Sequence, residues 1–232
     1  MRYLALATDY DGTLAHHGQV SDDTWKAVRR LRESGRKLLL VTGRELDDLR
    51  TVCPHLEWFD RIVAENGGLL YHPATCEEKL LAPAPAEDFV RALRAHQVSP
   101  LSVGRTIVAT WRPHEMAVLE TIRDMGLEMH IIFNKDAVMV LPTGVNKATG
   151  LKAALEELGL SEHGVIGIGD AENDHAFLAL CASSAAVANA LPTLKKQVDF
   201  VTRGDHGRGV IELIESLLTD DLAHLGPTRG HS

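Results

Sequence analysis

Hydrophobic and polar positions along this 232-residue chain follow two alternating patterns. Continuous apolar runs such as Tyr3 to Ala7 and Lys37 to Val41 predict strands that are buried on both faces. Between these runs, apolar positions recur at helical spacing in a segment that follows Ser21, a good N-cap residue. This alternation covers residues 3–70 and 147–218. It predicts an α/β fold, with a Rossmann-like, doubly wound, mostly parallel sheet and helices on both of its faces.

The middle of the chain follows a different pattern. The proline-containing segments 81–86 and 142–144 predict extended hinges. Between them, two helical stripes and several short apolar runs predict a small α+β unit. We therefore expect a core, residues 1–81 and 143–220, that is interrupted by a small α+β domain, residues 82–142.

Composition narrows the class of protein. The net charge is −8 and no basic stripe is present, which argues against a nucleic-acid partner. We find neither a signal peptide nor a segment long and apolar enough to cross a membrane. Residues 221–232 lack periodicity and are expected to form a disordered tail. The three cysteines are far apart and form neither a CxxC pair nor a disulfide framework, which is typical of a reducing compartment. We expect a cytoplasmic protein, monomeric or homodimeric.

Two carboxylates, Asp9 and Asp11, directly follow the first predicted strand, where Gly12 lets the chain turn. A doubly wound sheet binds its ligands just beyond the carboxyl ends of its strands. Two such carboxylates can hold a hard cation, and one of them can attack phosphorus as a nucleophile. In isolation, Asp-x-Asp is more typical of an Asx turn. The preceding strand and three further motifs favour the chemical interpretation.

The three further motifs also fall at predicted strand ends or at the start of a helix. They are Thr42-Gly43-Arg44, Lys147, and Gly169 to Asp174. Each has an ordinary structural explanation: a strand end, an exposed helix lysine, and a helix cap. Phosphoryl transfer, however, needs a nucleophile, positive charge around the phosphate, and a metal ion. The four motifs together supply all three.

We assign the chemistry as follows. Asp9, Asp170 and Asp174 are the candidate anchors for Mg²⁺, which would offset the repulsion between a carboxylate nucleophile and a phosphate. Lys147 would supply positive charge, and the Thr42 hydroxyl would donate to a phosphate oxygen. Asp11 would protonate the leaving oxygen and later activate water.

The motifs resemble a known family. Asp9 to Thr13, Thr42-Gly43-Arg44, Lys147 and Gly169 to Asp174 look like the four signature motifs of the haloacid dehalogenase superfamily of phosphohydrolases. The resemblance spans residues 3 to about 218. An insert between the second and third motifs resembles the type-IIB capped, Cof-like branch, as does Glu65-Asn66-Gly67-Gly68. The short cap is closest in size to the archaeal type of phosphoglycolate phosphatase.

The resemblance implies a role for each site residue. Asp9 would be the nucleophile that forms an aspartyl-phosphate, and Asp11 the general acid and base. Thr42 and Lys147 would hold the transferring phosphate. The implied ligands of Mg²⁺ are Asp9, the backbone carbonyl of Asp11 and Asp170, with Asp174 supporting through water. By the same resemblance, Arg44 and Asn66 would lie near the substrate phosphate or the leaving group. Together with the neighbouring Gly43 and two arginines of the insert, the residues expected to bind substrate are Gly43, Arg44, Asn66, Arg105 and Arg112.

The inserted domain, residues 82–142, which we call the cap, is harder to interpret than the core. Arg105, Arg112, His114 and Lys135 are candidates for contacts with an anionic or hydroxylated substrate. A solvated cap surface explains the same residues equally well.

The expected activity is Mg²⁺-dependent hydrolysis of a small soluble phosphate ester, a sugar phosphate or a phosphoglycolate-like compound. A phosphomutase would share the aspartyl-phosphate but return the phosphate to its substrate. A phospho-receiver signalling domain would also group acidic residues, a threonine and a lysine around Mg²⁺. That domain would be near half the present length and would lack the insert. A catalytically inactive binding module would be expected to have lost the nucleophile, the acid or the lysine, and all three are present.

Overall fold

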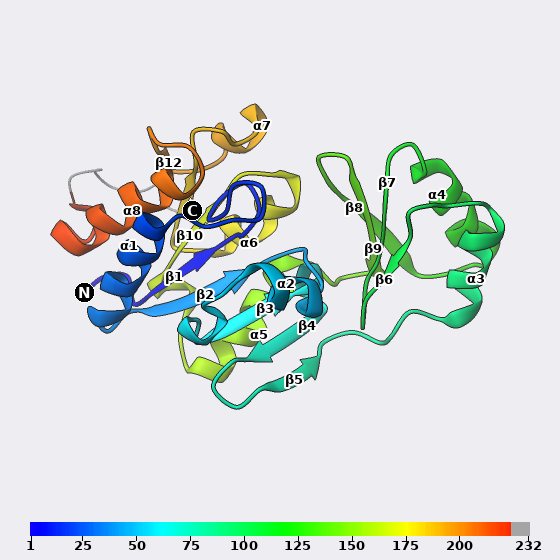
Figure 1. The fold of residues 1–232 in the computed structure, drawn as a ribbon, viewed down its shortest axis with the longest axis horizontal. Coiled ribbons are helices and arrows are strands. Elements are labelled where there is room, and N and C mark those ends of the chain that lie inside the picture. The colour runs from blue at the N-terminus through cyan, green and yellow to red at the C-terminus, as the bar shows by residue number, and fades with distance from the viewer. Residues whose placement is uncertain (224–232) are drawn as a thin grey trace.

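The computed structural model describes residues 1–223, which form two sheets (Figure 1). The larger sheet has the strand order β12-β11-β10-β1-β2-β3-β4-β5. Neighbouring strands from β12 to β3 pair in parallel, and β4 and β5 extend the sheet antiparallel at one edge. In this spatial order the strands are β12 (Phe200–Val201), β11 (Ser183–Ala186), β10 (Val165–Gly169), β1 (Ala5–Thr8), β2 (Lys37–Val41), β3 (Arg61–Ala64), β4 (Leu69–His72) and β5 (Glu77–Leu80).

Helices cover both faces of the larger sheet. From β1, the chain builds outward through β2 and β3 on one side and later through β10, β11 and β12 on the other. Because parallel crossovers are right-handed, the two directions place their helices on opposite faces. Four of these helices pack in two pairs, which are α1 (Asp22–Glu33) with α8 (His206–Asp220) and α5 (Lys147–Leu158) with α6 (His175–Leu180). The predicted doubly wound α/β fold is confirmed.

Short elements complete this part of the chain. Two of them are helices, α2 (Leu46–Val52) and α7 (Pro192–Lys195). The others are 3₁₀ turns, namely η1 (Leu56–Trp58), η2 (Glu65–Gly67), η3 (Glu162–Gly164) and η4 (Glu172–Asp174). The turns η2 and η4 carry residues of the predicted site.

The predicted insert has its own antiparallel sheet, in the order β6-β7-β9-β8, and its own hydrophobic cluster. Helices α3 (Glu87–Ala95) and α4 (Glu115–Asp124) lie on the side of this sheet that is turned away from the larger sheet (Figure 1). The opposite side faces the core. The strands are β6 (Ser102–Val103), β7 (Val108–Trp111), β8 (Met129–Asn134) and β9 (Ala137–Pro142).

The structure differs from the sequence-based expectations in a few elements. The strands β5 and β6 were not predicted, and their residues are exposed. The apolar spacing in the sequence predicts a last helix over residues 210–218, but helix α8 begins four residues earlier, at His206. Of the tail predicted for residues 221–232, Leu222 is buried and Asp221 accepts a hydrogen bond from Arg36. Residues 224–232 lie outside the described part of the chain.

Two further sequence observations concern the described residues. None of the helices in residues 1–223 has both the length and the apolar character needed to cross a membrane. The three cysteines are unpaired, and Cys53 and Cys181 are buried.

Candidate active site

The strand register brings the predicted motifs to one edge of the larger sheet. Thr8, the last residue of β1, lies beside Leu40 of β2 and Ile168 of β10. Asp9 follows β1 directly, and Thr42 and Asp170 follow the other two strands. Because β1 lies between β2 and β10, Asp9 is at the centre of the group.

Asp9, Asp170 and Asp174 form a buried acidic cluster, with one oxygen from each lying within 4.8 Å of the others. Burial raises the pKa of Asp9 well above its usual range, although Lys147 opposes this shift. Burial and the neighbouring Asp174 also raise the pKa of Asp170. Both shifts reflect the cost of gathering negative charge away from water. Hard oxygen ligands that already lie this close suit a small divalent cation.

Lys147 is a fully buried lysine that links two members of the acidic cluster. Its Nζ atom donates to Asp9 Oδ1 and to Asp174 Oδ1, both at 2.6 Å. Burial favours the neutral amine, but the Asp174 and Asp9 carboxylates outweigh burial and raise the pKa of Lys147. Lys147 begins helix α5, where the Asn146 side chain caps the helix. The ammonium is therefore charged and held in place by the start of a regular helix.

The loop after β10 is organised by Asp174. Its Oδ2 atom accepts hydrogen bonds from the backbone N–H groups of Asp170 (2.8 Å) and Ala171 (2.9 Å). Its Oδ1 atom accepts from Lys147. Both oxygens of Asp174 thus accept hydrogen bonds from the protein, and Asp170 Oδ1 accepts from Thr13 Oγ1 (3.3 Å) in the loop after β1. A Cβ atom on Gly12 would lie 2.3 Å from Asp170 Oδ2, so glycine is needed for this close approach.

Asp11 is engaged by Arg44 in a two-pronged ion pair. Arg44 Nε donates to Asp11 Oδ2 at 2.5 Å, and a terminal guanidinium nitrogen donates to Oδ1 at 2.7 Å. These hydrogen bonds raise the pKa of Arg44. The Thr42 Oγ1 atom accepts from the Arg44 backbone N–H at 3.1 Å. This hydrogen bond lies within the motif Thr42-Gly43-Arg44 and stabilises its turn. The structure therefore joins Asp11 and Arg44, which the sequence placed in separate roles.

Asn66 lies beside this arrangement and is fully buried. Its backbone N–H donates to the Thr42 carbonyl at 3.0 Å, and its Oδ1 atom accepts from Asn173 Nδ2 at 3.0 Å. The Asn66 Nδ2 and Asn173 Oδ1 atoms are buried without a hydrogen-bond partner among the described residues. Gly43 is adjacent to Asn66, because a Cβ atom on Gly43 would lie 3.8 Å from Asn66 Oδ1. The same Cβ atom would lie 3.2 Å from Met139 Sδ of the cap. The cap is thus seated closely over the second motif.

The candidate substrate residues of the cap have different surroundings. Lys135 reaches the acidic cluster, with its Nζ atom 2.7 Å from Asp170 Oδ2. Arg112 lies over the Phe133 ring, 5.3 Å from its centroid. His114 Nε2 lies 2.8 Å from the Ser99 carbonyl oxygen, within the cap. Of these three, only Lys135 is brought to the core motifs.

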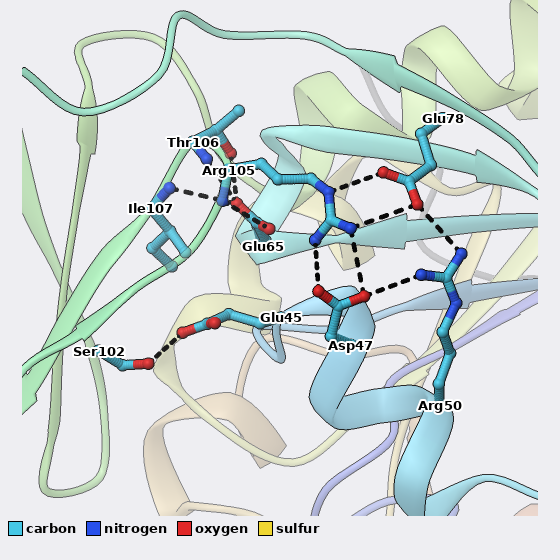
Figure 2. A network of polar contacts seen from close by, with 9 residues as sticks. All are labelled: Glu45, Asp47, Arg50, Glu65, Glu78, Ser102, Arg105, Thr106 and Ile107. Carbon is cyan, nitrogen blue, oxygen red and sulfur yellow. Dashed lines mark hydrogen bonds and ion pairs between the residues drawn. The ribbon is translucent and has the colours of Figure 1, made fainter.

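Arg105 occupies a separate network between cap and core (Figure 2). Its guanidinium pairs with Glu78 at 2.7 Å and Asp47 at 3.1 Å, and Arg50 pairs with the same two carboxylates. Ser102 donates to Glu45 nearby. The structure therefore joins Arg105 to helix α2 and strand β5 rather than to the acidic cluster.

Glu65 is a residue of this junction to which sequence reasoning gave no role (Figure 2). It is fully buried, and its Oε2 atom accepts from the Thr106 N–H at 2.7 Å and the Ile107 N–H at 3.2 Å. Oε2 also accepts from the Thr106 hydroxyl at 2.9 Å, and Oε1 accepts from the Arg105 N–H at 3.1 Å. In the sequence, the one indication of a role for Glu65 was its place in Glu65-Asn66-Gly67-Gly68, directly before the predicted site residue Asn66.

Comparison with known proteins identifies the class. A family model described as haloacid dehalogenase-like hydrolase matches residues 6–110 and 123–214, and the chain belongs to this family. The resemblance predicted from the four motifs is therefore confirmed, and the chain is a hydrolase.

Particular relatives narrow the comparison. Phosphoglycolate phosphatase from Methanothermobacter thermautotrophicus is 30% identical over 222 residues, which cover 92% of this chain and 98% of the relative. Phosphoglycolate phosphatase 2 from Saccharolobus solfataricus is 29% identical over 226 residues, covering 93% of each chain. The crystal structure of a haloacid dehalogenase-like hydrolase from Bacteroides thetaiotaomicron shares the fold. Its TM-score is 0.80 at 21% identity, over 93% of this chain and 99% of that one.

Proposed function

We propose that this hydrolase is a Mg²⁺-dependent phosphomonoesterase that acts on phosphoglycolate or a similar small ester through an aspartyl-phosphate on Asp9. The observation that supports it most is the buried chain of ion pairs from Asp9 through Lys147 to Asp174, beside Asp170 at the strand ends. This arrangement offers a nucleophile, a fixed positive charge and oxygen ligands in one place. The names of the two archaeal relatives support the choice of substrate.

The acidic cluster fits a hard cation. We assign Asp9, Asp170 and the backbone carbonyl of Asp11 as ligands of Mg²⁺. Asp174 has a supporting role, because both of its oxygens already accept hydrogen bonds. When bound, the ion offsets the repulsion between these carboxylates and the phosphate dianion.

Asp9 would then act as the nucleophile. Within residues 1–223, the one hydrogen bond to its carboxylate comes from Lys147 and reaches Oδ1, so we assign Oδ2 to the attack on phosphorus. The new oxygen–phosphorus bond forms as the bond to the leaving oxygen breaks. Lys147 and Thr42 would hold the equatorial phosphate oxygens during this step. Water then attacks the same phosphorus, which releases phosphate and restores the Asp9 carboxylate.

Asp11 would move the protons of both steps. It would protonate the leaving oxygen as an acid and then take a proton from the attacking water as a base. In the structure both carboxylate oxygens of Asp11 accept hydrogen bonds from Arg44, so neither oxygen is free to exchange a proton with the leaving group. We infer that the arriving substrate anion draws Arg44 away, so that Asp11 can carry a proton. Arg44 would thus couple substrate binding to the readiness of the acid.

A screen of phosphate esters tests this proposal. Phosphate release is measured for phosphoglycolate, hexose phosphates and sucrose phosphate, with Mg²⁺ and with excess EDTA. We expect turnover with Mg²⁺ that is lost in EDTA and in Asp9→Asn. Asp124→Asn, on the exposed surface of the cap, is the matched control and should keep its activity. Undiminished turnover in EDTA or in Asp9→Asn would contradict the mechanism.

A further inference from the structure

Lys135 is the only lysine in residues 82–142 and lies in the turn between β8 and β9. Its Nζ atom contacts Asp170 Oδ2 at 2.7 Å, and its backbone N–H donates to Glu172 Oε2 at 3.0 Å. The second contact is independent of the side chain, so it fixes the turn against the core whatever residue stands there. The side chain is about half exposed, at 49%. Its flexible stem therefore has room to move.

The other cations of the cap lie elsewhere. Arg105 is paired with Asp47 and Glu78, and Arg112 lies over an aromatic ring. The three remaining cations are on the helices that face away from the larger sheet (Figure 1), namely Arg91, Arg94 and Arg123. Within residues 82–142, all of which the structure describes, Lys135 is the one cation paired with the acidic cluster.

Lys135 and a metal ion would compete for the same carboxylate. Asp170 Oδ2 accepts from Lys135, and Asp170 is a proposed ligand of Mg²⁺. Two cations on one carboxylate repel each other, so a bound ion would favour a Lys135 ammonium that turns to another anion nearby. In a phosphate ester, the phosphate itself would face Asp9 and Lys147. The part closest to the cap is the leaving group.

We propose that Lys135 selects esters whose leaving group carries a carboxylate, by forming an ion pair with that carboxylate in the metal-loaded enzyme. This inference rests on the proposed phosphatase function and adds the charge of the leaving group to it. A single charged donor from the cap would distinguish a carboxylate from a neutral group of the same size. Such charge-assisted contacts are stronger than neutral hydrogen bonds.

A pair of esters of nearly equal size tests this selection. Phosphoglycolate carries a carboxylate where ethyl phosphate carries a methyl group. In Lys135→Gln, we expect kcat/KM to fall roughly 10- to 100-fold for phosphoglycolate and little for ethyl phosphate. Lys135→Arg should restore part of the loss. Arg91→Gln, on the outer helix α3, is the matched control and should change neither ester.

A metal titration without substrate gives a second, independent readout. If Lys135 competes with Mg²⁺ for Asp170, Lys135→Gln should bind Mg²⁺ several-fold more tightly than the wild type in calorimetry. Equal losses for both esters, or unchanged kcat/KM for phosphoglycolate, would overturn the proposal, and so would unchanged Mg²⁺ affinity. A wild type that ignores phosphoglycolate but releases phosphate from neutral esters would overturn the role of Lys135 and leave the proposed phosphatase function standing.

Discussion

Replacing Glu65 is expected to loosen the junction between cap and core. In Glu65→Ala, the N–H groups of Thr106 and Ile107 lose their acceptor in a place that water does not reach. Each buried donor left without a partner costs about 1–3 kcal/mol. Water that enters the space left by the smaller alanine side chain would offset part of this cost. We expect the free energy of unfolding to fall by about 3 kcal/mol, a large effect for one residue.

The Arg105 network provides the contrast for this prediction. Arg105 pairs with Asp47 and Glu78, whose side chains are 67% and 27% exposed. Exposed ion pairs are weakened by water and salt and contribute little to stability. Arg105→Met should therefore change the free energy of unfolding too little to resolve. Both substitutions remove charged contacts across the same junction, so burial is the feature that separates them (Figure 2).

Urea denaturation of the two variants measures this difference in the free energy of unfolding. Measuring kcat/KM then shows whether the loosened junction also disturbs the active site. Asn66 follows Glu65 directly, and its backbone holds the Thr42 carbonyl. Glu65→Ala should therefore lower kcat/KM even where the protein remains folded. If Glu65→Ala were as stable as the wild type, or if Arg105→Met lost as much stability, the reasoning from burial would be refuted.

Three further predictions concern the core motifs. Lys147→Met should abolish turnover of every ester alike, because Lys147 would hold the shared phosphate; a loss confined to some esters in kcat/KM would contradict this. Asp11→Asn should lose about 10²- to 10⁴-fold in kcat on alkyl esters and less on an aryl ester, whose leaving group needs no proton; equal losses would count against its role as the acid. The pKa values of Asp9 and Asp170 are raised in the folded protein, so at low pH the protonated carboxyls stabilise the metal-free fold. This contribution to the free energy of unfolding is lost as the pH rises above 3.8, the usual pKa of an aspartate. Because Mg²⁺ needs the ionised carboxylates, its addition should raise the melting temperature more near neutral pH than near pH 5; an equal rise at both would show that these groups do not bind the ion.

The motifs of the core could be predicted from sequence because they depend on local patterns. The run from Lys37 to Val41 is continuous and apolar, and it forms the predicted strand. The strand at Glu77–Leu80 could not be found this way, because its residues are exposed and it forms by pairing with β4. The start of α8 was missed because glycine is a poor helix former. In the structure, a Cβ atom on Gly207 would lie 2.3 Å from Thr24 Oγ1, so glycine allows α8 to approach α1.

The partners of charged cap residues could not be predicted for a related reason. Both Arg105 and Lys135 are cations in the insert, and the sequence made Arg105, but not Lys135, one of the residues expected to bind substrate. Their surroundings depend on how the cap is seated on the core. Arg105 meets Asp47 across the junction, and Lys135 meets Asp170 at the strand ends. Such contacts join residues that are far apart in the chain, and no local pattern encodes them.

The central claim is that phosphate passes through Asp9, and an acid-quenched reaction tests it most directly. In Asp11→Asn with 4-nitrophenyl phosphate, the leaving group departs without an acid, while hydrolysis of the intermediate lacks its base. Mass spectrometry of the digested protein should then find a phosphoryl group on the peptide that contains Asp9, and none after Asp9→Asn is added to the same variant. Release of nitrophenol by a protein that never carries phosphate on this peptide would contradict the account.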